Sequence, residues 1–287
     1  MRVCLVQLKV ARTDQPVQDR ILHVESLIRK ELQLADENKI DLIVLPETAF
    51  CSYCQPSAAS ALAVAQSQEL FIKEWAKTFS SQVKAYLAFG YIGQSCTSRD
   101  GPRNALAVFG PDGELVHDRS KRFLYDSDLV WTAERSGGFE VVTLDLLPKK
   151  PRVMFAICND INGKDFSDTE MDKYALARDA LEHDAHLIVL SAAWCSAHPD
   201  SPPWAHDDDI VENSQVEYWL NRLKPLWGRE VYFCCADLVG REKIPHRPGS
   251  KIKYCGSSCA ISLKTQSLIK PALPTWKEAT ICVDIPL

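Results

Sequence analysis

The sequence lacks both the long hydrophobic runs and the basic clusters that mark two large classes of proteins. No apolar run in its 287 residues approaches the roughly 18 residues that a membrane-spanning helix needs. No run of lysine and arginine is long enough for a nucleic-acid footprint, and the formal net charge is -5. We therefore expect neither a membrane nor a nucleic acid as a partner.

The first residues also lack the features of a secretory leader, because they follow a strand pattern with no small-residue cleavage site. The 11 cysteines are then expected to be reduced thiols, which places the protein in the cytosol or the nucleus. Two close pairs, Cys51 with Cys54 and Cys255 with Cys259, have loose spacing and no paired histidines. We therefore expect no structural zinc and no other metal.

Hydrophobic patterning alternates strands with helices along the chain, without repeats, low-complexity segments or a convincing linker. A Gly-Pro-Asp-Gly turn at 110–113 predicts a hairpin, and 120–139 reads as irregular. This pattern predicts one α/β domain over 1–287, with two mixed sheets face to face and helices outside. The predicted strands are 3–8, 41–45, 86–92, 104–109, 114–117, 141–146, 153–157, 186–192, 231–236, 259–262 and 281–285, and the predicted helices are 21–35, 57–79, 170–182 and 211–227.

A thiol ends the apolar run V-M-F-A-I, which is typical of a strand buried on both faces. Cys158 follows this run directly, and open α/β folds place ligands at the carboxyl ends of such strands. That position suits a nucleophile, with loop N–H groups beside it. The same stretch is equally typical of a buried cysteine that packs as a small hydrophobe.

A cysteine nucleophile needs a base, and its tetrahedral intermediate needs positive charge or N–H donors. Glu47 follows the buried run L-I-V-L-P, where loss of water would raise its pKa towards that of a general base. Lys121 lies just after the predicted hairpin and could supply the positive charge. Taken singly, Glu47 also fits a solvated loop glutamate, and Lys121 fits an ordinary surface lysine.

Together these residues resemble the nitrilase, or carbon–nitrogen hydrolase, superfamily. The resemblance runs along nearly the whole chain and includes I-D-L-I-V-L-P-E-T, G-P-R-N-A-L-A-V-F-G-P-D-G-E-L and A-H-L-I-V-L-S-A-A-W. It implies an α-β-β-α sandwich that forms homodimers, no cofactor, and a triad of Glu47 as base, Lys121 as stabiliser of the intermediate and Cys158 as nucleophile. The superfamily often has a second active-site carboxylate, and of Asp128 and Glu134 we favour Glu134.

Within the superfamily the chain is similar to the fungal protein N-terminal amidases, which deamidate N-terminal asparagine or glutamine. K-R-F-L-Y-D-S-D, A-I-C-N-D-I-N-G-K-D-F and V-E-Y-W-L-N-R-L-K-P-L carry this likeness. The chain departs from the pattern of this family at two positions. Asn159 occupies a position that another residue often fills, and Asp237 stands where many members have asparagine. The resemblance implies a peptide substrate with an N-terminal Asn or Gln.

For such a substrate we expect the backbone N–H of Asn159 to join Lys121 in binding the oxyanion. The free α-ammonium of the substrate calls for an anion in the pocket. We expect Asn162 and Asp126 to line that pocket. The nearby candidates as a group are Asp126, Asp128, Asp160, Asn162 and Asp165.

Three other interpretations stay open on sequence alone. The first is an amidase of the same fold that acts on a free small amide or an N-carbamoyl compound. The second is a catalytically silent binding protein of the same fold. The third is a papain-type enzyme that uses Cys195 with His198 or His206, although no papain-like signature surrounds Cys195.

Overall fold

The computed structural model describes residues 1–34, 39–95, 101–134, 137–163, 173–196 and 213–287. Its first sheet has the order β5-β4-β3-β2-β1-β13, so strands from the two ends of the chain lie side by side. Strand β1 is parallel to β2 and antiparallel to β13. The strands are β1 (Arg2–Lys9), β2 (Leu42–Val44), β3 (Tyr86–Gln94), β4 (Pro102–Phe109), β5 (Leu115–Ser120) and β13 (Ala279–Asp284).

The second sheet has the order β6-β7-β8-β9-β11-β12 and joins the first where the ends of β1 and β9 pair at Leu8 with Leu238 and Lys9 with Val239. Strands β7, β8 and β9 are parallel, and β10 pairs with the second half of β9. The strands are β6 (Val141–Thr143), β7 (Arg152–Ile157), β8 (Leu187–Ala192), β9 (Tyr232–Lys243), β10 (Lys251–Cys255), β11 (Cys259–Ser262) and β12 (Ser267–Leu268).

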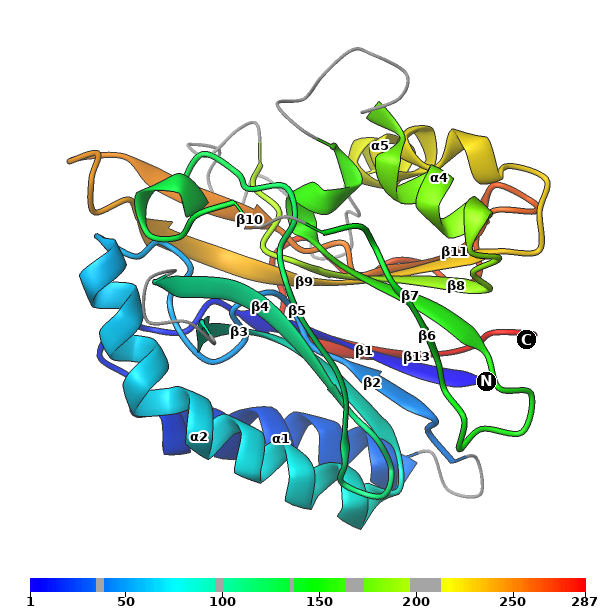
Figure 1. Ribbon diagram of the computed structural model, residues 1–287, viewed down its shortest axis with the longest axis horizontal. Helices are drawn as coiled ribbons and strands as arrows, with labels where there is room; N and C mark the ends of the chain where they lie inside the picture. The colour runs from blue at the N-terminus through cyan, green and yellow to red at the C-terminus, as the bar shows by residue number, and fades with distance from the viewer. Residues whose placement is uncertain (35–38, 96–100, 135–136, 164–172, 197–212) are drawn as a thin grey trace.

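Helices cover the outer faces of both sheets, as Figure 1 shows. Helices α1 (Val17–Leu34) and α2 (Ala58–Val83) pack on the first sheet, and α4 (Ala175–Glu182) and α5 (Asn213–Arg222) lie over the second. Lys84 ends α2 in the left-handed conformation, with its N–H bonded to Ser80. The arrangement confirms the predicted α-β-β-α sandwich.

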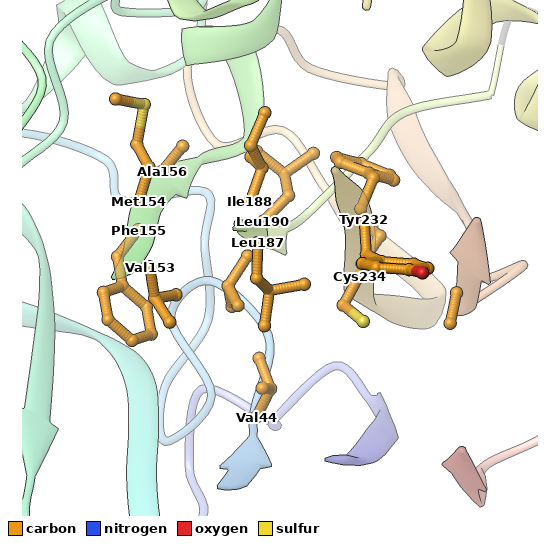
Figure 2. Packing of buried hydrophobic residues seen from close by; sticks show 14 of the residues in the cluster. Val44, Val153, Met154, Phe155, Ala156, Leu187, Ile188, Leu190, Tyr232 and Cys234 are labelled. Carbon is orange, nitrogen blue, oxygen red and sulfur yellow. The ribbon is translucent and has the colours of Figure 1, made fainter. Parts of the chain in front are cut away.

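Strand alternation explains the two cores, because successive side chains point to opposite faces. In β1, Val3 and Leu5 belong to the core between the sheets, whereas Cys4 and Val6 pack with α1 and α2. Figure 2 shows the inner core from close by, with Val44 of β2 pointing towards the sheet of β7 and β8. Strands that bury both faces in this way read as continuous apolar runs.

The structure differs from the sequence prediction in the last third of the chain. Strand β9 continues past Ala236 to Lys243, because Leu238 and Val239 pair with the end of β1 and residues 239–243 pair with β10. Strands β10 and β12 were not predicted from the sequence. Helix α5 ends at Arg222, and a separate 3₁₀ turn covers Lys224–Leu226, where Pro225 lacks an N–H for a continuing helix.

The parallel strands bring their carboxyl ends to one edge of the sandwich. Strands β2, β1, β9, β8 and β7 all run in the same direction through consecutive parallel pairs. The residues that follow β2, β7 and β8 therefore meet at this edge, which is where α/β folds place ligands. Among the described residues, no helix combines the length and apolar content needed to cross a bilayer.

Candidate active site

Glu47 follows β2 on a segment that stays paired with β3 after the strand itself ends. Gly90 donates its N–H to the Pro46 carbonyl at 3.0 Å and accepts from the Ala49 N–H at 3.0 Å. A Cβ on Gly90 would lie 2.4 Å from the Glu47 Cα, so only glycine allows this close approach. The side chain of Glu47 is fully buried. The backbone of two strands thus fixes the carboxylate.

Lys121 lies between two carboxylates in the interior. Its Nζ donates to Oε1 of Glu47 at 2.8 Å and to Oδ2 of Asp128 at 2.6 Å, and all three side chains are inaccessible to solvent. Asn104 donates from the same Nδ2 to Glu47 at 2.6 Å and to Asp128 at 2.9 Å. The Ala193 N–H, just after β8, donates to the other Glu47 oxygen at 2.9 Å. Five residues from four distant segments therefore hold one buried ionic cluster.

The charges of this cluster determine the protonation of its members. Burial by itself lowers the pKa of Lys121, but Asp128 and Glu47 raise it well above its usual range, so the ammonium stays charged. Burial raises the pKa of Glu47, while Lys121 opposes the rise. A carboxylate with a raised pKa accepts a proton more readily than a solvated one, which suits a general base.

Cys158 starts a short 3₁₀ turn, Cys158–Ile161, immediately after β7. Its backbone has φ of 42°, in the left-handed region that costs a non-glycine residue about 1–2 kcal/mol. Burial and the Glu47 charge raise the pKa of the Cys158 thiol well above its usual range, against the effect of Lys121. The resting sulfur is therefore a neutral thiol, and it needs a base to become a nucleophile.

A cavity of about 440 Å³ opens above Cys158. Ligand pockets of this size are common in enzymes. Every side chain that the described part of the chain contributes to its wall is neutral, and the charged cluster of Glu47, Lys121 and Asp128 does not line it. The wall consists of Tyr125, Cys158, Asn159, Asn162, Ala193, Trp194, Cys195, Ser196, Ser214, Gln215, Tyr218 and Cys255.

The structure corrects two of the sequence-based preferences. Glu134 is exposed, and it is Asp128 that contacts Lys121, so the second carboxylate of the cluster is Asp128. Asp126 is half exposed and pairs with Arg247 outside the cavity wall. The sequence of this loop does not show which acidic side chain points into the interior. The 3₁₀ turn at Asp128–Val130 determines it by burying Asp128.

The other nominated residues divide between the cavity wall and the scaffold. Asn159 and Asn162 line the cavity, as expected. Asp160 does not, because its buried carboxylate accepts the N–H groups of Arg122 and Phe123 at 2.9 Å and of Ile157 at 3.0 Å. It therefore ties the segment after Lys121 to the Cys158 turn. Asp165 lies outside the described residues.

Sequence reasoning missed Asn104 and Gly90 as parts of the site. The signal for Asn104 was present, since it falls inside the G-P-R-N-A-L stretch that resembles the superfamily. Asp237 proves to be a scaffold residue: its Oδ1 accepts the N–H groups of Trp194 and Leu238, both at 2.8 Å. The segment after β8 thus offers consecutive N–H groups to Glu47 and Asp237.

The remaining cysteines offer no second assembled site in the described part of the chain. No group of three or more His, Cys, Asp and Glu side chains there could hold a metal ion. Cys195 lies on the cavity wall, and burial raises the pKa of its thiol. The histidines of the papain-type interpretation, His198 and His206, lie outside the described residues.

Comparison with known proteins agrees with this geometry. The chain is similar to the "Protein N-terminal amidase" of Schizosaccharomyces pombe, with 25% identity over 86% of each chain. A crystal structure of an N-terminal amidase with an Asn-Glu-Ala peptide matches with a TM-score of 0.80 and 15% identity, over 99% of this chain and 97% of the other. A structure of an N-terminal amidase with a Gln-Gly peptide matches with a TM-score of 0.79 and 15% identity, over 98% and 96%.

A family model described as "Carbon-nitrogen hydrolase" matches residues 2–167, which include Glu47, Lys121 and Cys158. The resemblance seen in the sequence is thereby confirmed, and the chain belongs to the carbon–nitrogen hydrolase family.

Proposed function

We propose that this protein is a thiol amidohydrolase that converts N-terminal Asn or Gln of peptides to Asp or Glu with release of ammonia. The observation that carries the proposal is the buried Glu47–Lys121–Asp128 cluster beneath a neutral cavity that Cys158 lines. The similarity to proteins named N-terminal amidases supports the substrate class.

In the proposed reaction Glu47 takes the thiol proton of Cys158 as the sulfur attacks the side-chain carbonyl carbon of the substrate. The developing oxyanion is bound by the Lys121 ammonium and the backbone N–H of Asn159. Such preorganised donors away from water are worth several kcal/mol. The raised pKa of the thiol makes this coupled proton transfer necessary, because little free thiolate exists beforehand.

The tetrahedral intermediate then collapses to a thioester on Cys158. Glu47 returns the proton to the leaving nitrogen, so ammonia departs. A water molecule, deprotonated by the same glutamate, attacks the thioester, and the thiol regains its proton as the acid product leaves. The covalent step divides one difficult amide hydrolysis into two easier reactions. The roles of Asp128 and Asn104 are to hold Lys121 and Glu47 in place.

The charge of the described cavity wall can be compared with the charges of the alternative substrates considered within the family. An N-carbamoyl amino acid carries a carboxylate, and no lysine or arginine lines the described part of the cavity to bind it. Burying such a charge without a partner is costly. The same cost applies to the α-ammonium of an N-terminal Asn or Gln, because the described wall holds no carboxylate either. The charge of the wall therefore does not separate these substrates, and a free small amide remains the second outcome of the test. Cytosolic or nuclear location and homodimer formation stay predictions.

The test measures ammonia release from an Asn-initiated tripeptide, its acetylated form and free glutamine. We expect only the free Asn-peptide to react, and replacing Cys158→Ala should abolish the reaction while the protein still binds the peptide. A matched control replaces Cys234→Ala, a cysteine buried in β9 among core residues, and should retain activity. Equal turnover of the acetylated peptide would reject recognition of the N-terminus, and full activity without Cys158 would reject the nucleophile. Absence of all turnover would favour the silent binding protein.

A further inference from the structure

Helix α5, which lies over the second sheet (Figure 1), also contributes residues to the cavity wall. Gln215 and Tyr218 both line the cavity, and Arg222 follows at the spacing that places residues on the same helix face. Cys158 lines the same cavity, so a substrate at the nucleophile would lie beside this helix face.

A directed chain of hydrogen bonds holds most of this wall in place. Arg222 Nε donates to the Tyr218 hydroxyl at 3.1 Å, and that hydroxyl donates to Oδ1 of Asn162 at 2.5 Å. Asn162 Nδ2 donates to Oδ1 of Asn159 at 2.8 Å, and Asn159 Nδ2 donates to the Leu124 carbonyl at 2.9 Å. A guanidinium can only donate and a carbonyl can only accept, so the chain has one direction and neither amide can flip.

Gln215 stands beside this chain without joining it. Its side chain is buried, with 7% exposed, and its Nε2 has no hydrogen-bond partner in the part of the chain that the structure describes. The Tyr218 hydroxyl already donates to Asn162 and accepts from Arg222. A buried amide donor without a partner costs free energy, so such a group at a cavity wall points to an acceptor brought by the ligand.

We infer that Gln215 binds the carbonyl oxygen of the first peptide bond of the substrate. The inference rests on the proposed function and adds the residue that distinguishes a peptide from a free amino acid. The side-chain carbon attacked by Cys158 is only three or four bonds from the carbonyl carbon of Asn or Gln, so one cavity holds both. A neutral amide donor suits a neutral peptide carbonyl, whereas the carboxylate of free asparagine would need a cation that the described wall lacks.

The experiment compares a substrate that has this carbonyl with one that lacks the carbonyl and all atoms beyond it. An Asn-Glu-Ala peptide contains it, and 3-aminopropanamide retains the ammonium and the carboxamide but lacks it. Gln215→Met removes the donor with little change in volume. We expect kcat/KM to fall about tenfold on the peptide, the worth of one buried hydrogen bond, and to stay within about twofold on 3-aminopropanamide.

Two further variants sharpen the result. Gln68→Met changes a glutamine of α2 that lines a different cavity, and it should leave both substrates unaffected. Gln215→Arg adds a cation and should raise the rate on free asparagine relative to the peptide. Equal losses on both substrates with Gln215→Met, or no loss on the peptide, would overturn the inference while the amidase function stands. A wild-type protein inactive on the peptide would overturn the proposed function and this inference with it.

Discussion

Asn104 offers a direct test of how the buried cluster sets the protonation of Glu47. Its single Nδ2 donates to Glu47 and to Asp128, and both acceptors are buried carboxylates. The bond to Glu47 lowers the pKa of that residue and so opposes the effect of burial. Asn104→Leu keeps the approximate shape and removes both donors. We therefore expect the pKa of Glu47 to rise.

The size of the change follows from the bond that is lost. A hydrogen bond to a charged group contributes about 1.5–3 kcal/mol, and one pKa unit corresponds to about 1.4 kcal/mol. The pKa of Glu47 should thus rise, because its ionised form loses this stabilisation. Only the ionised carboxylate can take the thiol proton. The acidic limb of the kcat/KM profile should therefore move to higher pH, so activity on that limb should fall about tenfold or more and recover as pH increases.

The assay is ammonia release from an Asn-peptide between pH 4.5 and 9, with folding checked by circular dichroism. Gln7→Leu is a matched control, because Gln7 is also a fully buried amide, yet its Nε2 donates to the neutral carbonyls of Pro274 and Lys277. That variant should lose stability without moving the acidic limb. A folded Asn104→Leu protein whose acidic limb stays at the wild-type pH would refute the reasoning.

Two further predictions concern the scaffold. Gly90→Ala forces a Cβ against the backbone of Glu47. We expect urea unfolding to show a loss of about 1–3 kcal/mol in stability, and ammonia release to show at least a tenfold fall in kcat. As a control, Gly138→Ala should change neither quantity, because the nearest atom to its added Cβ lies at 4.0 Å. Asp160→Ala leaves three backbone N–H groups without their acceptor. Urea unfolding should therefore show that the free energy of unfolding falls by at least about 3 kcal/mol. As a control, Asp145→Ala removes an exposed ion pair and should lower it by less than about 0.5 kcal/mol. Unchanged stability of Asp160→Ala would contradict its role in joining the two segments.

The strands that position the site were readable in the sequence because they are buried on both faces. Apolar runs of this kind end abruptly, and the first reactive side chain after each end is conspicuous, as Glu47 and Cys158 are. The end of β9 was not readable, because its last residues, Arg241, Glu242 and Lys243, are polar and take part in the strand through their pairing with β10.

The sequence by itself determined the family, the sandwich and the triad candidates, since these depend on local patterns of apolar and reactive residues. Only the tertiary structure decided which polar side chains serve the site and which serve the scaffold. Asp128 and Asp160 are buried acids in neighbouring loops, yet Asp128 contacts the Lys121 ammonium of the site, whereas Asp160 accepts the N–H groups of Arg122, Phe123 and Ile157 and joins two scaffold segments. Glu134 has the same chemistry and stays exposed. Burial and the choice of partner depend on segments distant in the chain, and for that physical reason no local pattern encodes them.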